Sequence, residues 1–141
     1  MNEKITEEKM TYLFIKNFDR KGQQLISEVP VFAKSVDMVN YNRKENTITA
    51  IEFKQTKWKK AIEQVLALSI AFDFLEICIL EPKTQKCKNT IIEECKNRGI
   101  GLYFIDTEKE KISHEVMPIN KIDIWQLQKL EILSYISMRG N

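Results

Sequence analysis

The stretch AIEFKQTKWKK, residues 50–60, joins the end of an expected strand to the start of an expected helix. Apolar and polar residues alternate up to Lys54, a period-two pattern that is typical of a β-strand. Glu52 and Lys54 share one face of this strand. The opposite face carries Ile51 and Phe53, and apolar residues also precede Glu52 on its own face. Because both faces are partly apolar, these charged side chains need a partner or a metal ion.

The strand that precedes this stretch brings a second acid to it. Residues 35–41 and 47–54 are predicted to form a β-hairpin joined by a polar turn. A symmetric turn places Asp37 directly opposite Glu52, on the face that also carries Lys54. Two carboxylates across a ladder lie about 5 Å apart at Cβ and repel each other. A divalent cation between them reverses that effect, and carboxylate oxygens with water suit Mg²⁺ or Mn²⁺.

The remaining elements place this hairpin in a larger sheet. Helices are predicted over 6–18, 58–72, 89–97 and 122–137, and further strands over 25–31, 74–80 and 100–105, with an edge strand within 110–118. Three early strands precede the first crossover helix, which favours a mixed sheet over a doubly wound one. The expected fold is therefore α/β (α+β), a central mixed β-sheet flanked by helices, in one domain over residues 1–141.

Composition excludes several classes of protein. The 141 residues include 43% hydrophobic and 30% charged residues with a net charge of +2, which argues against disorder and against a globally basic nucleic-acid binder. Cys78, Cys87 and Cys95 form no CxxC pair, so neither a zinc site nor a disulfide framework is expected. The charged N-terminus and the lack of a long apolar run predict no signal peptide and no membrane span. These features together favour the cytoplasm.

The order Asp37, hairpin, Glu52-Phe53-Lys54 and immediate helix resembles the PD-(D/E)XK nuclease superfamily, the restriction-endonuclease-like fold. The resemblance covers roughly residues 7–106 as an αβββαβ core, and the chain adds an extra C-terminal helix. Val36 stands where the family motif has its leading Pro. The motif-bearing positions are few, so the order of the elements carries most of the resemblance.

The resemblance implies a role for each motif residue. Asp37 and Glu52 would be metal ligands together with the backbone carbonyl of Phe53, and Lys54 would assist the attacking water. Many members of the superfamily add a Gln or Lys from the helix after this strand. Gln64 fits that place here.

Members of the superfamily often place a Glu of the first helix at the metal site, and either Glu7 or Glu8 matches it. Glu7 is preferred because it shares a helix face with Met10 and Phe14, which are expected to point at the sheet. Taken alone, both acids are also ordinary first-turn residues favoured by the helix dipole.

Lysines gather where the second helix begins. Lys57, Lys59 and Lys60 follow Lys54 closely, and they predict either a nucleic-acid-binding patch or an ordinary solvated helix start. His114 is distant from the acids in sequence and is interpreted as a surface or structural residue.

These observations predict a nuclease that hydrolyses phosphodiester bonds with Mg²⁺ or Mn²⁺ as cofactor. The resemblance alone favours DNA as the partner, with RNA as an alternative. One such module cuts one strand, so double-strand cleavage needs a homodimer or a larger nuclease assembly. The alternative is a catalytically silent module of the same fold that binds nucleic acid or docks within a defence, transposition or repair complex. A plain exposed charge pair at Glu52 and Lys54 is the structural alternative.

Overall fold

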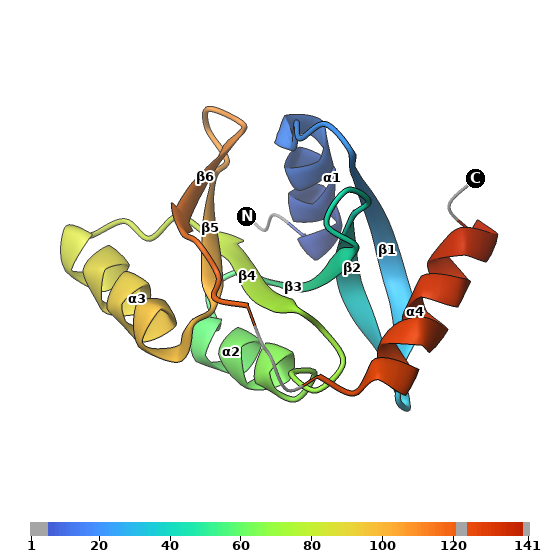
Figure 1. Ribbon diagram of the computed structural model, residues 1–141. Helices are drawn as coiled ribbons and strands as arrows, with labels where there is room; N and C mark the ends of the chain where they lie inside the picture. Colours follow the sequence, from blue (N-terminus) through green and yellow to red (C-terminus); the bar gives the residue numbers. More distant parts are fainter. Residues whose placement is uncertain (1–5, 121–123, 140–141) are drawn as a thin grey trace.

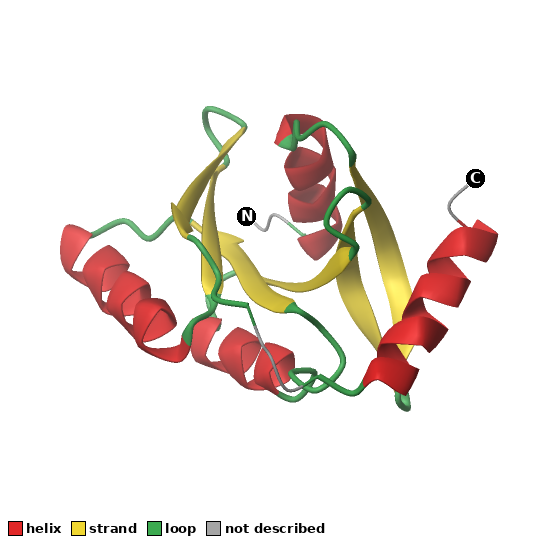
Figure 2. Ribbon diagram, viewed as in Figure 1, coloured by secondary structure: helices red, strands yellow, loops and turns green. Residues whose placement is uncertain are grey.

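The computed structural model describes residues 6–120 and 124–139. Six strands form one sheet, and four helices flank it (Figures 1 and 2). The elements are α1 (Glu7–Asn17), β1 (Gln23–Val31), β2 (Lys34–Asn42), β3 (Thr47–Lys54), α2 (Trp58–Leu66), β4 (Phe74–Leu80), α3 (Gln85–Arg98), β5 (Gly101–Asp106), β6 (Lys111–Val116) and α4 (Gln126–Arg139). Within the described ranges, no helix combines the length and apolar character that a bilayer crossing requires.

The sheet is mixed, as predicted, and its strands lie side by side in chain order from β1 to β6. β1, β2 and β3 pair antiparallel, β3, β4 and β5 pair parallel, and β6 returns antiparallel along β5. The parallel pair β3–β4 requires a crossover connection, which α2 supplies. β1, which contains Pro30, is an edge strand, and β6 is the other edge.

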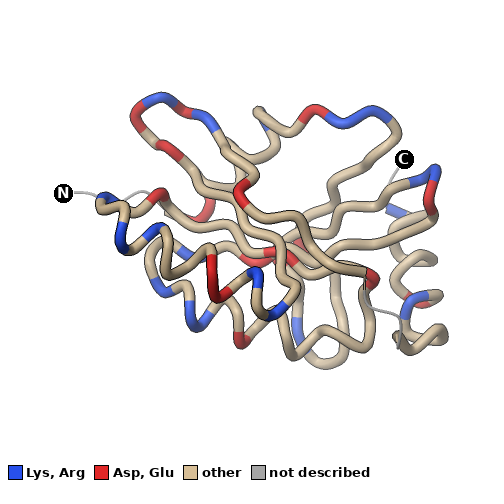
Figure 3. Tube along the Cα trace, turned by 60° about the vertical axis from the view of Figure 1, so that its left-hand side comes forward, with Lys and Arg blue, Asp and Glu red and all other residues tan. Residues whose placement is uncertain are grey.

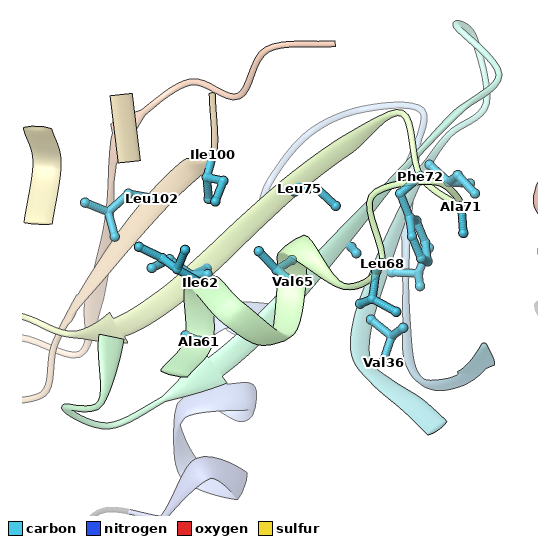
Figure 4. Packing of buried hydrophobic residues seen from close by; sticks show 14 of the residues in the cluster. Val36, Ala61, Ile62, Val65, Leu68, Ala71, Phe72, Leu75, Ile100 and Leu102 are labelled. Carbon is cyan, nitrogen blue, oxygen red and sulfur yellow. The ribbon is translucent and has the colours of Figure 1, made fainter. Parts of the chain in front are cut away.

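Helices cover the two faces of the sheet unequally. α1 lies alone on one face, where Met10, Leu13 and Phe14 pack against Phe53 and its buried neighbours. α2, α3 and α4 bury their apolar residues in a larger core on the other face. Figure 4 shows how α2 fills that core. Part of the α1 face is therefore left without a covering helix.

The boundaries of the second, third and fourth helices differ from the predicted ones. The second helix ends at Leu66 rather than at residue 72. Beyond it, backbone hydrogen bonds between residues three positions apart form successive turns up to Ala71. The backbone N–H of Asp73 then donates to the carbonyl oxygen of Ile48, and the backbone N–H of Ile48 donates to the side chain of Asp73. Those bonds hold the chain in position for β4, and the continuing apolar run gave no sign of them in the sequence.

The third helix begins four residues earlier than predicted. Thr84 accepts a hydrogen bond from the backbone N–H of Cys87 at 3.1 Å and so caps the helix, which draws the expected loop of residues 83–88 into α3. The predicted cap Thr6 of α1 and the predicted stop of α3 at Gly99, with φ 70°, are confirmed. The predicted start of the last helix at Ile122 lies outside the described residues, but Ile124 and Trp125 are not helical, so α4 runs from Gln126 to Arg139 rather than over the predicted range.

A strained residue forms the turn between β1 and β2. Phe32 adopts φ 58° in a two-residue turn and is 50% exposed. Aromatic residues rarely adopt a left-handed conformation, which costs on the order of 1–3 kcal/mol. We expect Phe32→Gly to raise the free energy of unfolding by roughly 1 kcal/mol, measured by urea denaturation. Ala33→Gly is the matched control, because Ala33 has no positive φ. Equal destabilisation by both substitutions would contradict the strain.

Candidate active site

The predicted pair of acids meets where β2 and β3 separate. The observed register pairs Tyr41 with Ile48 as predicted, and the ladder ends one residue short of Asp37. The backbone N–H of Asp37 points to Glu52 Oε2 at 3.4 Å. In return, the backbone N–H of Phe53 donates to Asp37 Oδ2 at 2.9 Å. Each carboxylate thus contacts the other strand, and the two acids lie together.

Burial changes the chemistry of Glu52. Its side chain is in the interior, with only 7% of the residue exposed. Desolvation, followed by repulsion from Asp37, raises the pKa of Glu52 to about 8. One proton therefore stays on the pair near neutral pH. A cation that binds there must displace this proton, so its affinity is expected to rise with pH.

Lys54 links the pair to the first helix. Its Nζ lies 3.8 Å from Oε2 of Glu7, in the first turn of α1. Glu7 and Glu8 both line a pocket of about 330 Å³ that also includes Asp37. The preference for Glu7 over Glu8 gains support from this ion pair. Because Glu7 is largely exposed, the ion pair orients Lys54 more than it stabilises the fold.

Gln64 lies on the other side of the acid pair. It lines a pocket of about 350 Å³ together with Glu52 and the turn that carries Phe32. Asp37 instead borders the pocket beneath α1. The predicted common face for Asp37 and Glu52 is therefore corrected: the acids touch, but each opens to a different pocket. The register between β1 and β2 skips Asp37 at this point, opposite Glu28, which has φ 53°.

The lysines that follow do not form one patch. Lys59 borders a pocket of about 330 Å³ between α2 and α3, together with Glu94 and Arg98. A helix turns by about 100° per residue, so Lys59 lies about 200° from Lys57, whereas Lys57 and Gln64 share a face. Lys59 therefore borders a different pocket from the acid pair, and its contact with nucleic acid stays a prediction. Lys57 and Lys60 are exposed at the start of α2.

The residues present fit a hard divalent cation. Among residues 6–120 and 124–139, no group of three or more His, Cys, Asp or Glu side chains is arranged to hold a metal ion. Mg²⁺ often binds through only one or two carboxylates and keeps several waters. Asp37 and Glu52 supply two, and the backbone of Phe53 lies against Asp37. Burial, and then repulsion from Asp37, raise the pKa of Glu52 and disfavour its ionised form unless a cation neutralises it.

A second polar cluster was missed by the sequence analysis. His114 is not a lone surface residue: its Nε2 lies 2.9 Å from Oε2 of the buried Glu76, and Nδ1 lies 2.8 Å from Arg20. Glu76 stands in a strand that reads as apolar, and β6 returns His114 to it across β5. The acid inside an apolar strand was the available signal, but its partner depends on strand order.

The acid pair predicts how stability depends on pH. The folded state holds a proton on Glu52 up to about pH 8, whereas an unfolded Glu releases it near its ordinary pKa of 4.5. Between these values the folded protein binds more protons, so the contribution of Glu52 to stability falls as the pH rises. We expect Glu52→Gln to flatten this fall and to be the more stable protein at about pH 9.

Urea midpoints at about pH 6 and pH 9 in EDTA measure this effect. Glu45→Gln, in the exposed turn between β2 and β3, is the matched control and should keep the pH dependence of the original protein. An unchanged pH dependence in Glu52→Gln would show that Glu52 is ionised in the folded state.

The comparisons with known proteins concern the fold. No family model matches the chain, and no curated protein matches it. Among solved structures, it is similar to a protein of unknown function from Silicibacter pomeroyi, with a TM-score of 0.62 and 15% sequence identity over 84% of this chain and 75% of that chain. At this identity the likeness shows a shared fold alone. The chain therefore has a mixed α/β fold in which a six-stranded mixed sheet is flanked by four helices.

Proposed function

We propose that this protein is a nuclease that hydrolyses phosphodiester bonds of DNA with Mg²⁺ or Mn²⁺. The contact between Asp37 and Glu52 carries the proposal, since two facing acids in a partly buried position destabilise a protein that does not use them. Lys54 follows two residues later on the same strand. Its ammonium pairs with Glu7, which lines the same pocket as Asp37. The resemblance to the PD-(D/E)XK superfamily supports the same roles.

Each side chain has a task in this proposal. Asp37, Glu52 and the Phe53 carbonyl would hold the cation, which when bound polarises the phosphoryl oxygen and lowers the pKa of water. Lys54 carries a positive charge that stabilises negative charge developing on the phosphate. Glu7 holds the Lys54 ammonium in place. Gln64 offers an amide to a phosphate or water on the Glu52 side.

Basic and acidic residues are interspersed along the chain rather than gathered in one basic region (Figure 3). Lys57 and Lys60 are exposed at the start of α2, which follows directly from the strand that carries Glu52 and Lys54. They would attract a phosphate backbone locally, and such binding weakens as salt concentration rises.

One observation favours the catalytically silent alternative. One oxygen of each carboxylate already accepts a hydrogen bond from a backbone N–H of the opposite strand, so the pair also helps to hold the ends of β2 and β3 together. A protein that kept the acids only for this purpose would bind DNA or a larger complex without cutting.

A cleavage assay separates the two functions. End-labelled single-stranded, duplex and branched DNA, and RNA, are incubated at about pH 8.5 with Mg²⁺, Mn²⁺ or EDTA. We expect cleavage of DNA with either metal and none in EDTA. Binding without cleavage under every condition would support the silent module instead. Nicks without double-strand breaks would indicate that the protein acts on one strand at a time.

A further inference from the structure

Another pocket lies on the part of the α1 face that no helix covers. It has a volume of about 210 Å³ and lies between the N-terminal halves of β3 and β4 and the segment after β6. Side-chain amides and hydroxyls line one part of it, and an apolar part is formed by Phe74, Met117 and Pro118. Typical pockets for drug-sized ligands measure about 300–1,000 Å³, so this one suits a smaller molecule.

The pocket has a built polar wall. The guanidinium Nη2 of Arg20 donates to the hydroxyl of Tyr103 at 2.6 Å and lies 2.8 Å from Nδ1 of His114. A guanidinium only donates, so Nδ1 accepts and the ring proton stands on Nε2. That proton faces Oε2 of Glu76 at 2.9 Å. The His114 ring also stacks on Tyr103 with centroids 4.0 Å apart. The wall is therefore fixed before any ligand binds.

The buried Glu76 in this wall is unfavourable by itself and needs space on the neighbouring strand. Glu76 is only 2% exposed, and burial of a carboxylate is unfavourable unless it is fully paired. A Cβ at Gly101 would lie 2.5 Å from Oε2 of Glu76, so the neighbouring strand carries no side chain there.

An unsatisfied group completes the pocket. Asn40 donates from Nδ2 to Oε1 of Gln23 at 2.7 Å, and its Oδ1 is buried without a hydrogen-bond partner among the described residues. Buried polar atoms without a partner are uncommon in native proteins, and each calls for an explanation. A ligand that brings a donor, directly or through water, would supply the missing bond.

The charges select the kind of ligand. Arg20 and Glu76 are the charged residues of the lining. Their opposite charges offset each other, with the His114 ring between them. An anion would be repelled by Glu76, and a cation by Arg20. A neutral, planar molecule with adjacent N–H and C=O groups matches carboxamides on one side and an apolar surface on the other.

We propose that this pocket binds a nucleobase, presented by a free nucleoside or by an unstacked nucleotide of a strand. It is distinct from the acid pair: Asn40 and Thr49 lie three residues from Asp37 and Glu52 along their strands, about 10 Å away. The intervening residues of the sheet lie beneath α1. The proposal therefore goes beyond nuclease activity and stands whether or not the protein cuts DNA.

Binding is tested without catalysis. The uniformly ¹⁵N-labelled protein is titrated in EDTA with adenosine, guanosine, cytidine and thymidine, with glucose as a neutral polar control, and with a short single-stranded oligonucleotide. We expect at least one nucleoside to shift the amide signals of Thr47, Thr49 and His114 while those of Glu52 and Lys54 stay in place. If only the oligonucleotide shifts them, the base is read within a strand.

Variants of the pocket sharpen the result. Asn40→Leu and Thr49→Val should each weaken nucleoside binding by about tenfold, because each loses one polar group of a buried site. Glu93→Gln, on the exposed side of α3, is the control and should bind like the original protein. The titration of the original protein decides the matter if a variant fails to fold. Shifts with glucose but with no nucleoside or oligonucleotide, or no shifts at all, would overturn the proposal.

Discussion

Replacement of Lys54 by Met is expected to lower the rate of metal-dependent DNA cleavage by at least about 100-fold, since one preorganised charge at a reacting phosphate is worth that much. Lys54 is partly buried and its main charged contact is the exposed Glu7, so the variant should fold normally. Initial rates on the substrate that the protein cuts best measure the effect. Lys44→Met, in the exposed turn at the opposite end of β3, is the matched control and should keep the original rate.

Asp37→Asn should have a still larger effect, about 10³-fold or more, because several kilocalories of charge stabilisation go with the cation it helps to hold. The amide keeps the shape of the acid, so hydrogen bonding with the backbone of Phe53 continues. If both Lys54→Met and Asp37→Asn cut as fast as the control, the cleavage does not come from this site.

The second large effect concerns stability. Asp73 and Lys129 form a buried ion pair with Oδ2 and Nζ 3.0 Å apart, and Asp73 also accepts the backbone N–H of Ile48 at 2.8 Å. Asp73→Leu leaves both the ammonium and the backbone N–H without this partner. We expect a loss of about 3–5 kcal/mol in the free energy of unfolding, measured by urea denaturation, because a buried charge without a partner is costly.

A double-mutant cycle supplies the control for this prediction. Lys129→Met combined with Asp73→Leu removes both charges, and apolar pairs often replace buried ion pairs with little loss. The double variant should therefore be more stable than Asp73→Leu alone. Simple addition of the two single losses would show that the pair contributes nothing as a pair and that α4 is held only by its apolar contacts.

The site was more predictable than the helix boundaries. The contact of Asp37 with Glu52 followed from counting back from a symmetric turn, because hairpin register is a local property. The shared face of Glu52 and Lys54 stays a prediction from strand periodicity. In contrast, the chain after α2 is held by hydrogen bonds between Asp73 and Ile48, which are distant in sequence. No local pattern could reveal that contact.

Two features of the site needed three-dimensional information. Asp37 and Glu52 line different pockets, and the register between β1 and β2 skips Asp37 opposite Glu28, whose positive φ its sequence neighbours do not signal. The pairing of His114 with Glu76 depends on which strands flank β5. Simple alternation could place each side chain on a face, but it could not say which strands lie side by side.

A manganese-soaked crystal tests the central claim most directly. At a pH above about 8, where Glu52 loses its proton, anomalous scattering would locate the ion without reference to any activity. We predict a manganese peak between the carboxylates of Asp37 and Glu52, next to the Phe53 carbonyl. A map without a peak there, with both carboxylates still bound to the backbone N–H groups of the opposite strand, would contradict the metal site and the nuclease function built on it.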